Sequence, residues 1–193
     1  MTVVLRFDGR RPPRGLTAVP AVVVDGAADI DEATATARRV IVVGSAANLA
    51  SVLTRLLKTD RLGVEVAHAS RWLPSGRMVT GTAQRIPLIR DETGTVVAGA
   101  ARWLPVPGAS TIHGEAVVDD TVLFDGETTE VQIEPLPTMP GLRARVAGGR
   151  WVAGRAAQLG TTGAVVLRDG VPVPRPARRS TFYRHTQGWL RVG

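Results

Sequence analysis

The sequence has 193 residues, of which 44% are hydrophobic, and a formal net charge of +7. This length and composition suit one large domain or two small ones with a buried core, and they exclude an intrinsically disordered chain. The absence of cysteine excludes disulfides, thiolate zinc sites and a cysteine nucleophile. No apolar run reaches the roughly 18 residues of a membrane-spanning helix, and the first residues lack a signal-peptide pattern. We therefore expect a cytoplasmic protein, with the periphery of the membrane as the other location.

The charge is distributed unevenly along the chain. Residues 141–193 hold ten arginines and a single acid, whereas residues 115–134 hold seven acids and no Arg or Lys. Segments of opposite charge can lie side by side and neutralise one another. Alternatively, the arginines can face an anionic partner such as a nucleotide phosphate, a lipid head group or nucleic acid.

The first 68 residues predict an α/β unit. Apolar runs at residues 3–7 and 21–24, each followed by an Asp-Gly pair, predict two strands, and we expect the second to be buried. A short helix that begins at Asp29 or Asp31 leads into a third strand at residues 39–43.

Residues 39–68 have the clearest pattern. Gly44 ends the apolar run, and a helix is predicted from Ser45 to Lys58 because apolar residues recur at the spacing of one buried helix face. These residues are Leu49, Val52, Leu53, Leu56 and Leu57. A strand follows at residues 64–68, so we expect a β-α-β unit with a parallel crossover.

Beyond residue 68, short alternating runs and turn residues replace the helical pattern. Hairpins are predicted at residues 86–98 and at residues 121–134, the second around Asp125-Gly126. Residues 103–108 are typical of a linker. Further strands are expected at residues 142–146, 155–159, 164–167, 180–184 and 189–192. The predicted fold class is α/β or α+β, with a mostly parallel α/β domain at residues 1–104 and an antiparallel β-sandwich-like domain at residues 105–193.

The turn at residues 44–48 is the first candidate site. A glycine-led turn at a helix N-terminus presents free backbone N–H groups to an anion, although an ordinary capped helix has the same pattern. The C-terminal stretch around residues 175–189 mixes arginine with aromatic residues, as a nucleic-acid-binding surface does. The candidates for binding an anion or a nucleotide are Gly44, Ser45, Ala46, Ala47, Asn48, Arg178 and Arg179.

The acidic segment is the candidate metal site. Asp119, Asp120 and Asp125 could supply carboxylate ligands to Mg²⁺, and a solvated hairpin is the alternative. The three histidines are too far apart in sequence to suggest zinc, and no GxSxG motif is present. We therefore assign no catalytic residue from the sequence.

The order of the predicted units resembles that of the bacterial diacylglycerol/sphingosine-type lipid kinases. In that family a strand leads into a GGDGT loop that holds the phosphates of ATP; residues 42–48 are similar, but only Gly44 agrees. The family also has a DGE turn whose glutamate is tied to catalysis. Asp169-Gly170-Val171 is similar, with valine in place of the acid. The family's NPxSG segment has no match.

The resemblance implies a lipid-kinase-like fold, while the loss of both motifs argues against phosphoryl transfer. The sequence thus predicts a non-catalytic binding or regulatory protein, a pseudoenzyme. Its expected partner is an anionic small molecule, a phospholipid surface or a protein, and the chain could also form a homo-oligomer. No cofactor is assigned. The alternative is a diverged lipid kinase that uses ATP and Mg²⁺, and a second alternative is a nucleic-acid-binding module.

Overall fold

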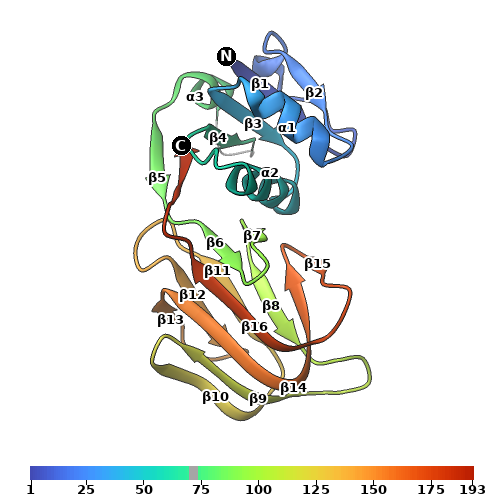
Figure 1. Ribbon diagram of the computed structural model, residues 1–193, viewed down its shortest axis with the longest axis vertical. Helices are drawn as coiled ribbons and strands as arrows, with labels where there is room; N and C mark the ends of the chain where they lie inside the picture. The colour runs from blue at the N-terminus through green and yellow to red at the C-terminus, as the bar shows by residue number, and fades with distance from the viewer. Residues whose placement is uncertain (70–73) are drawn as a thin grey trace. The chain divides into compact units, whose positions relative to one another are not determined.

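The computed structural model describes residues 1–69 and 74–193, which form two compact units (Figure 1). Unit 1 consists of Met1–Ile86 together with Gln187–Gly193, and unit 2 consists of Pro87–Thr186. The domain boundary expected at residues 104 and 105 thus falls inside unit 2. None of the helices in the described ranges is long and apolar enough to cross a membrane.

Unit 1 is an α/β unit with a six-stranded sheet in the order β2-β1-β3-β4-β17-β5. All neighbouring pairs are parallel except β17 with β5. Its elements are β1 (Thr2–Arg6), the 3₁₀ helix η1 (Arg14–Leu16), β2 (Ala21–Val23), α1 (Ala27–Ala35), β3 (Arg39–Val43), α2 (Ala46–Lys58), β4 (Glu65–His68), α3 (Ser75–Thr80), β5 (Ala83–Ile86) and β17 (Trp189–Val192).

The sheet of unit 1 is covered on both faces, which explains its unbroken apolar strands. Every residue of β3 is buried. On one face, Ile41 and Val43 pack with Leu16 of η1 and Met78 of α3. Because side chains alternate along a strand, Val40 and Val42 point to the other face, on the side of the neighbouring helices α1 and α2 (Figure 1). The predicted helix and its buried face are confirmed, with Leu49, Val52, Leu53 and Leu56 buried.

Three features of unit 1 differ from the sequence-based expectation. The strand expected to be buried at residues 21–24 is the exposed edge strand β2, where Val23 is 52% exposed, because among the described strands it pairs only with β1. The short helix α3 has too few turns to give a periodic pattern, and it was not expected. The strand expected at residues 189–192 exists, but it joins the sheet of unit 1 rather than the β-rich part.

Unit 2 is an antiparallel, sandwich-like arrangement organised by its longest strand, β14. One half of β14 pairs with β9 and β16, and the other half pairs with β8 and β15, so two sheets share it. The elements are β6 (Ile89–Asp91), β7 (Val96–Val97), β8 (Ala101–Leu104), β9 (Ile112–Val118), β10 (Thr121–Thr128), β11 (Val131–Pro135), β12 (Leu142–Val146), β13 (Val152–Gly154), β14 (Ala156–Arg168), β15 (Val171–Pro172) and β16 (Ala177–Arg184).

The core of unit 2 corrects two predictions. Residues 103–108 are not a linker, since Trp103 in β8 is fully buried, lies 6.0 Å from Phe182 between ring centroids and donates from Nε1 to Ser180 Oγ. The hairpin expected around Asp125-Gly126 is also wrong, because β10 runs straight through this pair. Gly126 adopts a φ of 115° within the strand, and the chain turns at Asp119-Asp120 instead. The hairpin β6–β7 is confirmed.

Arg39 is the polar anchor of unit 1. The residue is 7% exposed, and its guanidinium donates to Glu65 Oε2 (2.7 Å from Nε) and to the carbonyls of Met78, Val79 and Gly81 at the end of α3. These bonds satisfy carbonyls that a helix C-terminus leaves without partners. They also attach α3 to the start of β3.

We expect Arg39→Ala to lower the free energy of unfolding by about 3 kcal/mol, because it leaves the Glu65 carboxylate and these carbonyls without their donor. Arg38→Ala is the matched control. Arg38 lies 3.6 Å from the same carboxylate, but its side chain is 82% exposed, so its loss should cost at most about 0.5 kcal/mol. Urea denaturation of the three proteins measures both effects, and equal losses for the two variants would contradict the anchoring role.

Candidate functional site

The strand order of unit 1 reverses between β1 and β3. β1 and β3 are parallel neighbours, with Arg6 opposite Val43. From β1 the chain goes to β2 on one side of the sheet, and then crosses to β3 on the other side of β1. Ligands of open α/β sheets bind at such a reversal of strand order, beyond the carboxyl ends of the strands. Phe7 N donates to Val43 O at 3.1 Å, so the loops after β1 and β3 begin side by side.

The loop after β3, residues 44–48, is held closed by its own side chains. Ser45 is the N-cap of α2: its Oγ accepts from Asn48 N at 3.3 Å, and Ser45 N donates to Asn48 Oδ1 at 2.6 Å. Gly44 is buried against this pair, since a Cβ there would lie 2.6 Å from Asn48 Oδ1. From β4, His68 Nε2 donates to Gly44 O at 3.1 Å. These bonds hold the loop to the first turn of α2 and to β4.

The loop presents backbone donors rather than side-chain charges. Ala46 and Ala47 occupy the first turn of α2, where amides have no intrahelical acceptor, and no acceptor is found for them among the described residues. The positive end of the helix dipole lies at the same place. The turn can therefore accept an anion, but it carries no carboxylate that could bind a metal or a proton.

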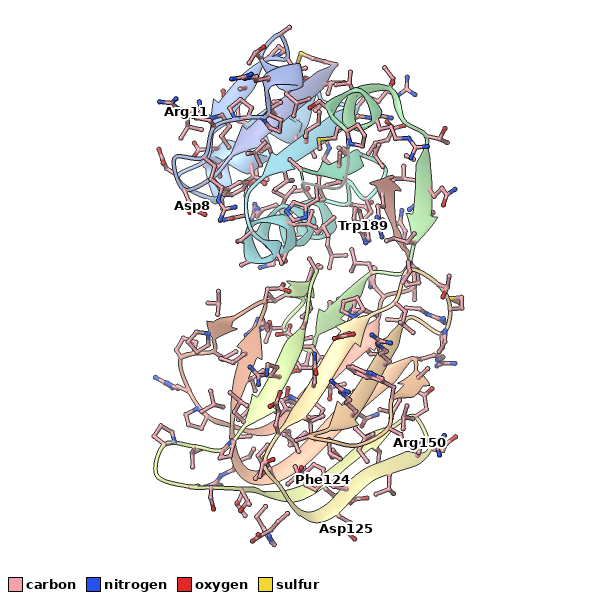
Figure 2. The ribbon with its side chains drawn as sticks, turned by 180° about the vertical axis from the view of Figure 1, so that it is seen from behind. Asp8, Arg11, Phe124, Asp125, Arg150 and Trp189 are labelled. Atoms are coloured by element: carbon pink, nitrogen blue, oxygen red, sulfur yellow. The ribbon has the colours of Figure 1, made fainter. Side chains whose placement is uncertain are left out.

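Arginines follow β1 at the same sheet edge. Arg6 Nε donates to Arg10 O at 3.0 Å, and Arg10, Arg11 and Arg14 are exposed. Figure 2 shows Arg11 and Asp8 projecting from this segment. None of these four arginines forms an ion pair within the described ranges. The sheet edge therefore combines free amides with unpaired positive charge.

The three candidate metal ligands lie in different environments. Asp119 accepts hydrogen bonds from Arg155 N and Ala156 N, at 3.0–3.1 Å, and so closes the turn between β9 and β10. Asp120 is exposed beside it. Asp125 lies in β10 opposite Glu115. No group of three or more His, Cys, Asp or Glu residues suited to a metal ion is found in the part of the chain that the structure describes.

Most of the C-terminal basic stretch forms β16 of unit 2, and its last residue, Trp189, begins β17 of unit 1. Arg178 and Arg179 are exposed on β16, and Arg179 pairs with Gly160. Of the three aromatic residues in this stretch, Phe182 and Trp189 are buried and belong to the cores. Tyr183 lies outside, with the Arg90 guanidinium 4.6 Å from its ring centroid.

His185 also contacts Arg90 and is a neutral group. Its Nδ1 accepts from Arg90 Nε at 3.2 Å. Burial, and then the charge of Arg90, lower the pKa of His185 below its ordinary value. The imidazole therefore adds no positive charge to the strand at neutral pH.

Asp169 has a structural role that the sequence pattern did not reveal. Its carboxylate accepts from three successive backbone amides, those of Ala98, Gly99 and Ala100, at 3.0, 2.6 and 3.0 Å. Three such N–H groups form an anion-binding concavity, which this carboxylate fills. The turn that resembles the family's DGE motif thus fastens β14 to the start of β8.

An unbroken Asp-Gly-Glu triplet also occurs at Asp125-Gly126-Glu127, which the sequence reasoning passed over. It lies inside β10, with Glu127 opposite His113. Thr111 Oγ1 donates to Glu127 at 3.3 Å. The triplet is part of a straight ladder, whereas the family motif occupies a turn.

Of the comparisons with known proteins, the structural one identifies the fold. No family model and no curated protein matches the sequence. In structure, the chain is similar to a diacylglycerol kinase from Bacillus anthracis str. Sterne, with a TM-score of 0.71 and 10% identity over 99% of this chain and 96% of that one. It is also similar to an NAD kinase from Archaeoglobus fulgidus in complex with ATP, with a TM-score of 0.67 and 10% identity over 100% and 94%. The protein therefore has a diacylglycerol-kinase-like fold, as the sequence resemblance implied.

We expect Asp169→Ala to lower the free energy of unfolding by about 2 kcal/mol, because three amides lose their acceptor. Asp169→Asn should lose about half as much, since it keeps one acceptor oxygen and tolerates the left-handed backbone at φ 51°. Asp120→Ala, in an exposed turn and with no such bonds, is the control. Chemical denaturation measures all three, and an Asp169→Ala protein as stable as the control would refute the anchoring role.

Proposed function

We propose that the protein is a non-catalytic, lipid-kinase-like binding protein. Its ligand is a phosphate-bearing small molecule, held at the edge of the unit 1 sheet by the first-turn amides of α2 and by the arginines after β1. The observation that carries the proposal is the closed loop at residues 44–48. It directs free N–H groups outward while Ser45 and Asn48 satisfy each other.

The same loop argues against phosphoryl transfer. That reaction depends on Mg²⁺ and on charges positioned around the phosphates. Ala46 stands where the resembling GGDGT loop has its aspartate, so the loop offers no acid. Asp119 is already engaged by Arg155 N and Ala156 N. These features support binding without turnover.

A diverged kinase that uses ATP and Mg²⁺ is the second candidate. The observation in its favour is that kinases match almost the whole chain in structure, one of them in complex with ATP. The two candidates agree on an anion at the loop and differ in metal dependence and turnover. They can therefore be separated by one set of measurements.

We expect isothermal titration calorimetry with ATP to show binding that needs no Mg²⁺, and incubation with Mg²⁺, ATP and diacylglycerol to give no phosphorylated lipid. Ala47→Glu should weaken ATP binding at least about tenfold, which is about 1.4 kcal/mol. A carboxylate in the first turn repels the anion while suiting the helix dipole, so the variant should fold normally.

Ala47→Gln is the matched control, because it has the same size and no charge, and it should bind nearly as the parent does. Phosphorylated lipid formed by the parent would contradict the non-catalytic proposal and favour the kinase. Equal ATP affinity in the Glu and Gln variants would place the ligand elsewhere.

A further inference from the structure

Unit 2 has a sheet face with an ordered pattern of outward residues. On the adjacent strands β10-β9-β14-β16, the pairing register aligns two rows. The strand neighbours Val118, Ala157 and Phe182 are buried in the core, so alternation points both rows away from it. One row is Val122, Val117, Gln158 and Thr181, and the other is Asp125, Glu115, Gly160 and Arg179.

This outer face is open and shallow. Val122 is 55% exposed, and Gln158 and Asp125 are exposed as well. Nothing lies within 4 Å of the position that a Cβ on Gly160 would take. Figure 2 shows Asp125 next to Phe124 on β10; Phe124 belongs to the core, and Asp125 to the outer face. Gly160 has no side chain, so another flat surface can approach closely at this point of the face.

The charges on this face are separated and unpaired. Glu115 on β9 and Arg179 on β16 lie at the same level, but β14 stands between them, which puts their strands about 10 Å apart. Neither side chain forms an ion pair or a hydrogen bond within residues 1–69 and 74–193. By contrast, Arg143 and Glu134 lie directly opposite on neighbouring strands of the same unit and pair at 2.6 Å.

We infer that this face docks a second copy of the chain, face to face, about a two-fold axis that runs along β14. Such an axis keeps each residue at its level along the strand and exchanges the β9 side with the β16 side. Glu115 then lies over the partner's Arg179, and Arg179 lies over the partner's Glu115. Gly160 meets the partner's Gly160 on the axis, where two packed sheets stand about 10 Å apart.

Charge complementarity selects this occupant. The face is acidic on β9 and β10 and basic on β16, so a uniformly anionic surface such as a membrane or nucleic acid would be repelled by half of it. A two-fold copy matches both halves at once, and the interface is the same patch on each subunit. The inference concerns unit 2 alone and does not depend on ligand binding in unit 1.

Sedimentation equilibrium of the full chain tests the inference. We expect a dimer whose dissociation constant rises with salt, because exposed ion pairs are screened. Glu115→Arg and Arg179→Glu should each raise that constant at least about tenfold, since each places two like-charged pairs across the axis. The double variant Glu115→Arg/Arg179→Glu should return it to within about threefold of the parent, because the swapped charges are again complementary.

Arg150→Glu, an exposed charge reversal in the turn before β13, is the control and should leave the dimer unchanged. Circular dichroism verifies that each variant folds, and Glu115→Gln with Arg179→Gln replace any that does not; these neutral variants should weaken the dimer in the same sense. A parent that stays monomeric at high concentration would overturn the inference. A dimer insensitive to the single changes, or a double variant that fails to recover, would overturn it equally.

Discussion

Insertion of β17 between β4 and β5 is the constraint on which the sheet of unit 1 depends. The last strand of the chain pairs in parallel with β4 and antiparallel with β5, and β5 pairs with no other strand of the described ranges. Gly188 permits this entry, because a Cβ there would lie 2.2 Å from Ile86 O. The chain must therefore complete unit 2 before the sheet of unit 1 can close, so residues 1–86 alone lack a strand of their own fold.

The same sheet determines what the candidate site can do. Parallel pairing of β1 with β3 brings two loops together at one edge, and the reciprocal bonds of Ser45 and Asn48 make the second loop rigid. Because those bonds engage the polar side chains of the loop, the loop itself offers backbone N–H groups to a ligand, and the arginines after β1 begin beside it. A site of this kind favours a bound anion without supplying the acid and metal chemistry of transfer.

Local patterns predicted the parts of the fold that local interactions form. Helix α2 and the flanking strands β3 and β4 were predictable because their buried residues recur at regular spacings in the sequence. Ser45, the N-cap, marks where the helix begins. Trp103 was mistaken for a linker residue because Pro105 and Pro107 follow it and dominate the local pattern. Its burial depends on a distant partner, Ser180, which lies 77 residues away in the sequence and accepts its N–H. Asp125-Gly126 failed for the same reason: the dipeptide favours a turn, but pairing with β9 keeps it extended. The site was half predictable, since Gly44 to Asn48 form a local motif and the arginines join them only through the sheet.

The uneven charge of the sequence has two physical outcomes in unit 2, and register decides between them. Where acid and arginine fall on adjacent strands, as for Glu134 and Arg143, they pair within the subunit and neutralise each other. Where β14 separates them, as for Glu115 and Arg179, no ion pair forms among the described residues. Composition alone cannot distinguish these cases, because the same acid and arginine can lie on adjacent strands or on strands that a third strand separates. The unpaired charges of the outer face are thus a property of topology, and the second subunit that we infer would supply their partners.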